Sequence, residues 1–297
     1  MQVAVIGATG MLGGPVTHEL IHAGFSIRII ARDVVKAVRL FPNTQVVAGD
    51  LRSVEGLVTA LAGVEVVYLN LSIRQTEKQA EFHTEGQGLW HLIEAARQAG
   101  VRRIAYLSSI VMRYQGMNGF RWWAFDVKQE AVRLIKASGI AFSIFYPSCF
   151  IDSINQTQRA GRFVLLVGRS TVCPWYISAS DYGKQVVRAL QIAKPGQNQE
   201  YVVQGPEAMT QHEAAERFVR AYRKESLTLL TTPPLLLKSG RLFSAQADYG
   251  WHITEAINHY PEVFEAGQTW ADLGKPQTTI EHVAAELSSA VHGREPK

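Results

Sequence analysis

Residues 3–14, VAVIGATGMLGG, decide how the rest of this sequence is interpreted. Four consecutive apolar residues run into Gly7, and Gly10 and Gly13 follow at three-residue steps, before a run compatible with a helix. This order predicts a buried strand, a tight turn and the start of a helix. Glycines in such a turn let a phosphate-bearing ligand approach the backbone, and the helix N-terminus offers unpaired N–H groups. We therefore expect this turn to bind the pyrophosphate of a dinucleotide.

Composition limits the class of protein. The chain has 297 residues, of which 47% are hydrophobic, so it can bury the core of a globular protein. Its 30 basic and 26 acidic residues leave a net charge of only +4, and the basic residues are scattered, so nucleic-acid binding is not indicated. Cys149 and Cys173 lack the spacing of a zinc site, so we expect reduced cysteines and no metal. A core strand at the start and no apolar run approaching about 18 residues predict a cytoplasmic protein without membrane contact.

Strand-like and helix-like segments alternate through the first half of the chain. After the first strand, the expected strands are residues 26–31, 44–50, 64–71, 102–109 and 141–147. The expected helices include residues 54–61, 81–98 and 124–137. This alternation is typical of a parallel sheet that is covered by helices on both faces. The predicted fold class is therefore α/β, with a Rossmann-type doubly wound parallel sheet.

The second half is less regular. Residues 163–168 are a short apolar segment, and we expect a helix from about Ser180, a strand at 201–205, and a helix capped by Thr210 with Glu213 three residues on. Residues 227–237 predict a strand and a Pro-initiated helix, and 279–291 a last helix before a polar, disordered tail. We assign residues 1–153, with a returning segment at about 175–204, to a Rossmann domain. Residues 154–174 and 205–297 are assigned to a smaller α+β substrate lobe.

The residues after the second expected strand indicate which dinucleotide binds. Arg32 follows that strand and Lys36 lies four residues further, so two cations can bracket a 2′-phosphate. This favours NADP(H). Asp33 is the opposing residue: pointing into the site it would favour NAD(H), and otherwise it caps the next helix.

Polar residues end the third, fourth and fifth expected strands. Asp50 either accepts a hydrogen bond from the adenine amino group or caps the following helix, and the two roles are compatible. The others are Asn70, Ser72, Ser108 and Ser109. Because ligands bind at the carboxyl edge of such sheets, we expect these side chains to line the cofactor groove.

Lys128 is the candidate catalytic residue. In the helix expected at 124–137 it is the only charged residue on the apolar stripe, so its ammonium group needs a partner or a ligand. It can hydrogen-bond a nicotinamide ribose or act as an acid or base. Alternatively, its stem lies at the edge of the stripe and its charge reaches solvent.

Several of these stretches together resemble the NmrA-like branch of the atypical short-chain dehydrogenases/reductases. They are GATGMLGG, ARD with Lys36, GDLRS, YLSS, Lys128 with the later KASGIAFSIFYPSCF, ASDYGKQVVRAL and YVVQGPEAMTQHEAAERF. The branch includes isoflavone and phenylcoumaran benzylic ether reductases, redox-sensing NADP(H)-binding regulators and quinone-reductase-like proteins. The resemblance spans roughly residues 1–220. It implies that the stretch from Tyr146 to Phe150 passes the nicotinamide.

The expected cofactor-binding residues come from these motifs and this resemblance. They are Gly7, Thr9, Gly10, Met11, Leu12, Arg32, Lys36, Asp50, Leu51, Asn70, Leu71, Ser72, Ser108, Lys128, Tyr146, Pro147 and Phe150.

The chain departs from the wider superfamily at its proton-handling groups. Typical members carry a Tyr-x-x-x-Lys pair, but Ala124 stands four residues before Lys128, and Ile110 stands where the assisting serine aligns. Tyr114 could supply a phenol from a different direction. Trp122 and Trp123 either form a lid over a planar substrate or simply pack.

Two functions follow from this interpretation. The first is an NADPH-dependent reductase of a small, apolar carbonyl, quinone or enone-like substrate, with Lys128 or water supplying the proton. The alternative is a non-catalytic, redox-sensing regulator in which NADP(H) occupancy changes affinity for a protein partner. An epimerase or dehydratase is disfavoured, because those reactions use the missing tyrosine.

Overall fold

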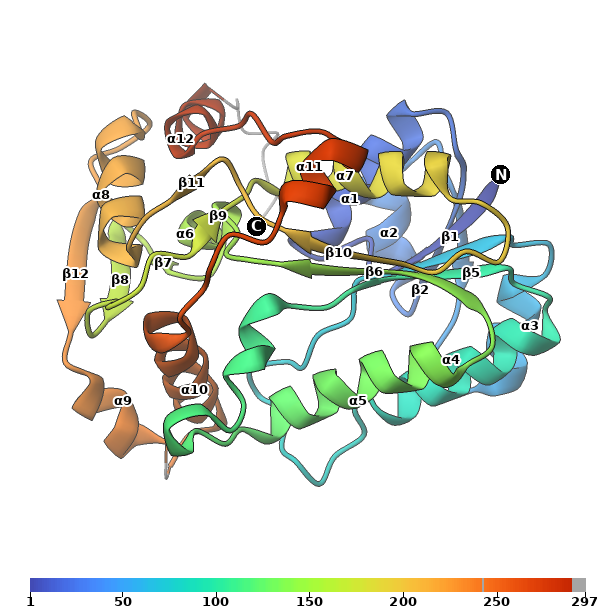
Figure 1. Ribbon diagram of the computed structural model, residues 1–297, viewed down its shortest axis with the longest axis horizontal. Helices are drawn as coiled ribbons and strands as arrows, with labels where there is room; N and C mark the ends of the chain where they lie inside the picture. Colours follow the sequence, from blue (N-terminus) through green and yellow to red (C-terminus); the bar gives the residue numbers. More distant parts are fainter. Residues whose placement is uncertain (242, 290–297) are drawn as a thin grey trace.

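A seven-stranded parallel sheet forms the centre of the protein (Figure 1). The computed structural model describes residues 1–241 and 243–289. The strand order is β10-β6-β5-β4-β1-β2-β3. The strands are β1 (Gln2–Ile6), β2 (Ser26–Ala31), β3 (Gln45–Ala48), β4 (Val66–Leu69), β5 (Arg103–Leu107), β6 (Ala141–Pro147) and β10 (Gln199–Val203). The order reverses between β1 and β4, where folds of this class bind ligands.

Helices cover both faces of the sheet, as predicted (Figure 1). One layer contains α3 (Val54–Leu61), α4 (Gln87–Gln98) and α5 (Trp123–Ala137). The opposite layer contains α1 (Gly13–His22), α7 (Ala179–Ile192) and α11 (Gly267–Leu273), and α2 (Val34–Leu40) follows β2. A separate buried apolar cluster lies beneath each layer, with Leu92 and Ile135 in the first and Leu20 and Val186 in the second. The sheet therefore has the doubly wound α/β architecture expected from the alternating segments.

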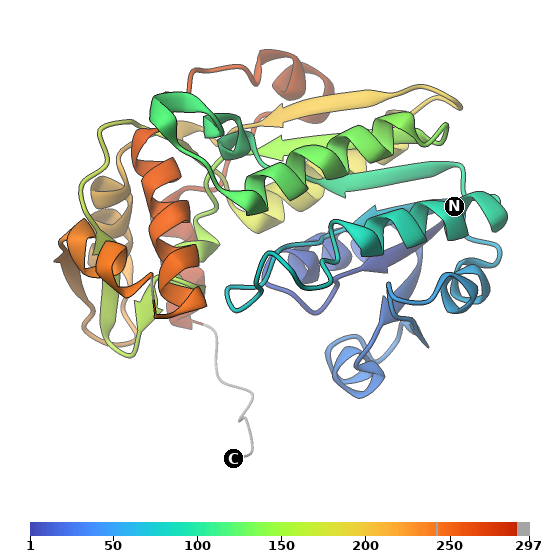
Figure 2. The same cartoon turned by 90° about the horizontal axis from the view of Figure 1, so that it is seen from below.

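The remaining elements gather at the carboxyl end of the strands. In both views the strand arrowheads point toward this part of the molecule (Figures 1 and 2). Its short strands are β7 (Arg159–Ala160), β8 (Phe163–Val167), β9 (Trp175–Tyr176), β11 (Glu207–Ala208) and β12 (Thr228–Thr232). Its helices are α6 (Asp152–Gln156), α8 (Gln211–Ala221), α9 (Pro234–Gly240), α10 (Ala245–His259) and α12 (Ile280–Ser289). A third apolar cluster, which includes Val164, Phe218 and Val283, holds part of this region together.

Local signals predicted several boundaries correctly. Thr210 Oγ1 accepts a hydrogen bond from Glu213 N at 3.2 Å and caps α8, as the sequence indicated. Residues 227–237 form strand β12 and then α9, which begins at Pro234. The last helix is present as α12, whereas the tail predicted after residue 291 lies outside the described residues. In the described ranges, 1–241 and 243–289, no helix has the length and apolar character needed to span a bilayer.

One predicted helix begins later than expected, and among the described residues helices α6, α10 and α11 were not predicted. The segment expected to be helical from residue 81 is irregular until Gln87, where α4 begins. There the ring of His83 contacts Glu77 Oε2 and Gln79 O, each at 3.1 Å, so tertiary contacts hold this loop in place of helical ones. Helix α10 was not predicted, although Ser244 Oγ accepts from Ala247 N at its start.

Candidate cofactor and substrate site

The glycine turn after β1 packs closely against itself and against the end of β4. Gly7 has a φ of +91°, and a Cβ there would lie 2.2 Å from Asn70 O. A Cβ on Gly13 would lie 2.0 Å from Gly7 O, but one on Gly10 would come no closer than 3.3 Å to it. Gly7 and Gly13 are thus required by the packing of the turn. Only Gly10 fits the sequence argument that glycine leaves room for an approaching ligand.

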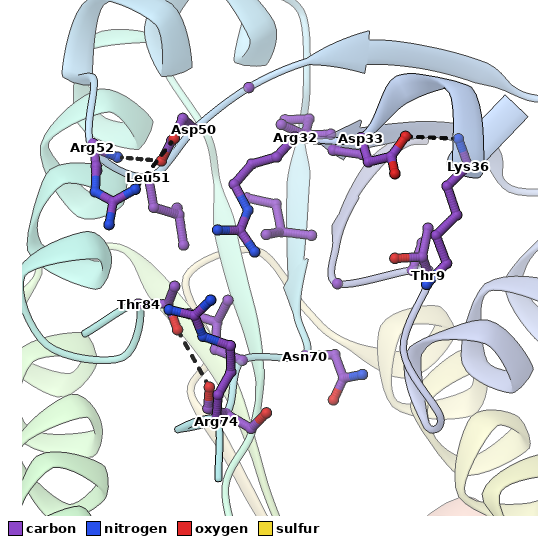
Figure 3. Close-up of a pocket in the computed structure, with 18 of the residues that line it drawn as sticks. Thr9, Arg32, Asp33, Lys36, Asp50, Leu51, Arg52, Asn70, Arg74 and Thr84 are labelled. Atoms are coloured by element: carbon purple, nitrogen blue, oxygen red, sulfur yellow. Dashed lines mark hydrogen bonds and ion pairs between the residues drawn. The ribbon is translucent and has the colours of Figure 1, made fainter. Parts of the chain in front are cut away.

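A cavity of about 570 Å³ lies beside this turn, at the carboxyl ends of β1, β2, β3 and β4 (Figure 3). Nine of the expected cofactor residues line it: Gly7, Thr9, Arg32, Lys36, Asp50, Leu51, Asn70, Leu71 and Ser72. These residues come from four separate strand ends, which the parallel sheet brings to one edge.

Four basic and three acidic residues line this cavity. Figure 3 shows Arg32 and Arg74 extending into it from different walls, and Lys36 extending toward Thr9. In the described part of the chain, the side chains of Arg32 and Lys36 have no hydrogen-bond or ion-pair partner. Asp33 Oδ1 accepts from Lys36 N at 2.9 Å and so caps α2. Asp33 also lines the cavity, but in the described residues it forms no ion pair with Arg32 or Lys36.

Two further arginines in this cavity were missed by the sequence reasoning. Arg52 lies over the Phe82 ring at 4.8 Å, and its guanidinium is 4.0 Å from Asp50 Oδ2. Arg74 Nε donates to Glu77 Oε1 at 2.8 Å. The position of Arg52, directly after the GDL stretch, was a usable signal, whereas Arg74 lies in a loop without a recognisable pattern.

The capping role considered for Asp50 is wrong. Ser53 caps α3, because its Oγ accepts from Gly56 N at 3.1 Å. Asp50 Oδ1 instead accepts from Arg52 N at 3.0 Å, which tightens the turn after β3. Its other oxygen still lies at the edge of the cavity, where the sequence placed an adenine contact.

A second cavity, of about 540 Å³, lies between the sheet edge and α10. Met11 and Phe150, both expected at the cofactor, line it together with Ser109. Its opposite wall includes the residues Tyr249, Gly250, Ile253, Thr254 and Ile257 of α10. Gly10 stands between Thr9 of the first cavity and Met11 of the second, so the glycine turn borders both.

The other expected cofactor residues line neither of these two cavities. Leu12 precedes α1, and Pro147 ends β6. Ser108 is buried, with its hydroxyl 3.6 Å from Met112 Sδ. Tyr146 donates its hydroxyl to Glu200 Oε2 at 2.7 Å, and its pKa is raised by burial and by that carboxylate.

Lys128 has a protein partner that the sequence did not reveal. Its Nζ donates to Glu85 Oε1 at 2.6 Å, and its side chain is 15% exposed while that of Glu85 is fully buried. Tyr106 also donates to Glu85 Oε1, at 2.7 Å, and burial followed by the Glu85 charge raises the pKa of Tyr106 well above its usual value. Lys128 lines neither of the two large cavities. The partner of Lys128 is thus Glu85, a buried residue just before α4.

The second cavity contains ionisable groups from the C-terminal part of the chain. Glu262 accepts from Ser148 Oγ and Gln204 Nε2, each at 2.7 Å, and burial raises its pKa. The pKa of Tyr249 is raised to about 12, by burial first and by the Glu85 charge second. Both residues follow Ser244, in the region where the sequence had shown only apolar character.

The aromatic residues of the loop before α5 serve in packing. Tyr114 is almost fully buried, with its ring centroid 4.9 Å from that of Phe120, and it lines neither large cavity. Trp122 stacks on His252 at 5.4 Å and Trp123 on His83 at 4.7 Å. These contacts agree with the packing role, and because both tryptophans also line a smaller cavity of about 360 Å³, the lid role stays a prediction.

Comparison with known proteins identifies the family. The sequence profile of the NmrA-like family matches residues 1–291. The chain belongs to the NmrA-like family. This confirms the resemblance seen in the sequence and extends it from about residue 220 to nearly the whole chain.

Curated relatives of this NmrA-like protein have different named roles. The chain is 29% identical over 220 residues to the NAD(P)H azoreductase of Xenophilus azovorans, covering 72% of this chain and 71% of the relative. It is 23% identical over 274 residues to the Photosystem II assembly factor Ycf39 of Cyanophora paradoxa, covering 90% of this chain and 83% of the relative.

Solved structures share the fold over the full length. The NADPH-dependent quinone oxidoreductase QOR2 of Escherichia coli, complexed with NADPH, superposes with a TM-score of 0.72 at 21% identity, covering 96% of this chain and 99% of that one. The triphenylmethane reductase of Citrobacter sp., complexed with NADP(H), also gives 0.72, at 19% identity and the same coverage. The architecture is thus the Rossmann-like fold of NAD(P)-binding reductases.

Proposed function

We propose that this NmrA-like protein is an NADPH-dependent reductase of small, mostly apolar carbonyl, quinone or enone-like acceptors. The observation that carries the cofactor assignment is the pair of cations in the first cavity, Arg32 and Lys36, which have no partner in the described residues. Asp33 lines the same cavity but caps α2, and in the described residues it pairs with neither cation. Arginine and lysine without carboxylate partners form a site for a dianionic phosphate, which distinguishes NADPH from NADH.

The residues present fit a dinucleotide along the sheet edge. Gly10 leaves room beside the turn for a pyrophosphate, and α1 begins directly after it. The adenosine end would lie in the first cavity, against Leu51 and Leu71, and the nicotinamide end would face the second. Bound NADPH supplies a hydride from its C4 position to the acceptor.

The second cavity supports the acceptor class. Its walls combine apolar side chains, such as Ile253 and Ile257, with hydrogen-bonding ones, so it can hold the apolar body of an acceptor and bond its oxygen. The named substrates of two relatives, an azo compound and a quinone, are planar and reducible by hydride. Lys128 lines neither cavity, so with Glu85 holding its ammonium group it would influence the reaction through its charge.

The test combines cofactor binding with turnover. NADPH and NADH binding are measured by isothermal titration calorimetry, and NADPH oxidation is followed with 1,4-naphthoquinone, methyl red and cinnamaldehyde as acceptors. Lys128→Met is compared with Lys136→Met, since Lys136 lies on the same helix but pairs with Glu200 at 2.8 Å. We expect turnover that falls in the Lys128 variant only, while NADPH still binds.

A second function, an NADP(H)-sensing regulator, is favoured by the pairing of Lys128 with Glu85, which keeps the one remaining proton-handling cation engaged. Ala124 and Ile110 supply no proton donor. Absence of turnover with all three acceptors, together with an NADPH-dependent change in association state measured by light scattering, would favour the regulator over the reductase.

A further inference from the structure

The chain lacks the tyrosine that usually stands four residues before the lysine, but the second cavity brings a phenol from elsewhere. Tyr249 belongs to the face of α10 that forms a wall of this cavity. Ile253, Thr254 and Ile257 lie on the same face, because residues three and four apart on a helix are neighbours. An acceptor molecule in this cavity would therefore meet the α10 face that carries Tyr249.

The Tyr249 hydroxyl is available to a ligand. Its ring packs edge-on against Trp122, with centroids 5.1 Å apart, and this contact orients the side chain. Within residues 1–241 and 243–289 its hydroxyl has no hydrogen-bond partner. The hydroxyl of Tyr260, which lines the same cavity, is bonded to the Arg113 side chain. An oriented phenol without a protein partner can donate to a substrate oxygen at no cost in existing hydrogen bonds.

Charge connects Tyr249 to Lys128. Of the three tyrosines that line the cavity, Tyr249 is the one whose pKa responds to Glu85, while those of Tyr176 and Tyr260 respond to Glu262. Glu85 uses one oxygen, Oε1, for both Tyr106 and Lys128. Its other oxygen, Oε2, is buried and has no partner among the described residues. A buried carboxylate with a spare acceptor thus lies within electrostatic range of the free phenol.

We propose that Tyr249, on the α10 wall of the second cavity, is the proton donor of this protein. The inference rests on the reductase function proposed above. As the acceptor carbon gains hydride, the electron pair of its C=O bond moves to oxygen. That oxygen takes the Tyr249 proton, so the phenol O–H bond breaks and a substrate O–H bond forms. A water proton then restores the phenol.

Glu85 and Lys128 are positioning residues in this scheme. The ammonium 2.6 Å from Glu85 Oε1 offsets part of the carboxylate charge near Tyr249. Without Lys128, the uncompensated carboxylate would oppose formation of a phenolate nearby and would slow proton donation. The effect expected for Lys128 substitutions therefore runs through Tyr249, even though Lys128 does not line the cavity.

The decisive experiment compares Tyr249→Phe with Tyr114→Phe in the full-length protein. Both changes remove one hydroxyl, but Tyr114 is buried away from both large cavities. NADPH oxidation with cinnamaldehyde and 1,4-naphthoquinone gives kcat, and calorimetry gives the Kd of NADPH. A positioned general acid contributes about 10²- to 10⁴-fold to a rate, so we expect Tyr249→Phe to lower kcat with cinnamaldehyde by about 100-fold or more.

The controls distinguish this inference from the function on which it rests. NADPH affinity should stay within about twofold of wild type in both variants, and Tyr114→Phe should retain its kcat. If the wild type is active and Tyr249→Phe lowers kcat by less than tenfold, the assignment of Tyr249 as proton donor is overturned, while the reductase function stands. Lack of turnover by the wild type with every acceptor overturns the reductase function and, with it, the proton donor.

Discussion

Replacing Arg32 by Ala tests the cofactor assignment most directly. Arg32 extends into the first cavity and has no protein partner in the described part of the chain (Figure 3). Its removal therefore breaks no internal ion pair, and the fold should be unaffected. Asp33 remains bound to the backbone N–H of Lys36, so the substitution releases no competing carboxylate.

The size of the effect follows from the contact that would be lost. A hydrogen bond to a charged group contributes about 1.5–3 kcal/mol, which corresponds to about a 10- to 150-fold change in Kd. NADH lacks the 2′-phosphate, so its affinity should change by less than about twofold. Lys36 remains in the cavity as the second cation, so the loss of NADPH affinity should not exceed this range.

Isothermal titration calorimetry gives the Kd of NADPH and of NADH. The titrations are done at low ionic strength, because salt screens the interaction between exposed charges. Arg39→Ala is the matched control, since Arg39 lies in α2 but does not line the cavity. Equal losses for NADPH and NADH, or an equal loss of NADPH affinity in Arg39→Ala, would refute the phosphate assignment.

Three further predictions concern the turn and the charge pair. Gly13→Ala places a Cβ 2.0 Å from a backbone oxygen and should abolish NADPH binding in calorimetry, whereas Gly14→Ala, with 3.6 Å to its nearest neighbour, should bind normally. Glu85→Leu leaves the Lys128 ammonium without its partner and should lower the free energy of unfolding by about 3–5 kcal/mol in urea denaturation; a loss below about 1 kcal/mol would contradict the burial argument. Tyr249 must be protonated to donate, so activity should fall as pH rises through its pKa, at about 12. Burial is the larger cause of this raised pKa and the Glu85 charge the smaller one, so Glu85→Gln should move the alkaline limb of kcat to lower pH, and an unmoved limb counts against the coupling.

Most strands of the central sheet and the helices between them were predictable because they depend on local patterns. Apolar runs such as residues 64–71 and 141–147 became β4 and β6, with ends trimmed by a few residues. The prediction of an apolar stripe on α5 was also correct, since Phe125, Ala131 and Ile135 are buried. Such patterns fix which side of an element faces the core without knowledge of its neighbours.

The loop at residues 73–86 and helix α10 could not be placed in the same way. The loop takes its shape from side-chain contacts such as that of His83 with Glu77, which a periodicity argument cannot detect. Helix α10 has a low contrast between its faces, because one face lines a cavity and carries Tyr249 and Thr254. A helix that borders a site departs from the amphipathic pattern of one that only covers a core.

The sequence by itself determined the strand, the glycine turn and the first helix, because their constraints act between residues adjacent in the chain. It also located the cations after β2 and the one charge on the apolar stripe of α5. Only the tertiary structure decided that Asp33 caps a helix, that Lys128 meets Glu85, 43 residues away, and that Tyr249 comes from α10. Ion pairs and cavity walls form between segments distant in sequence, and their geometry exists only once the sheet has brought those segments together.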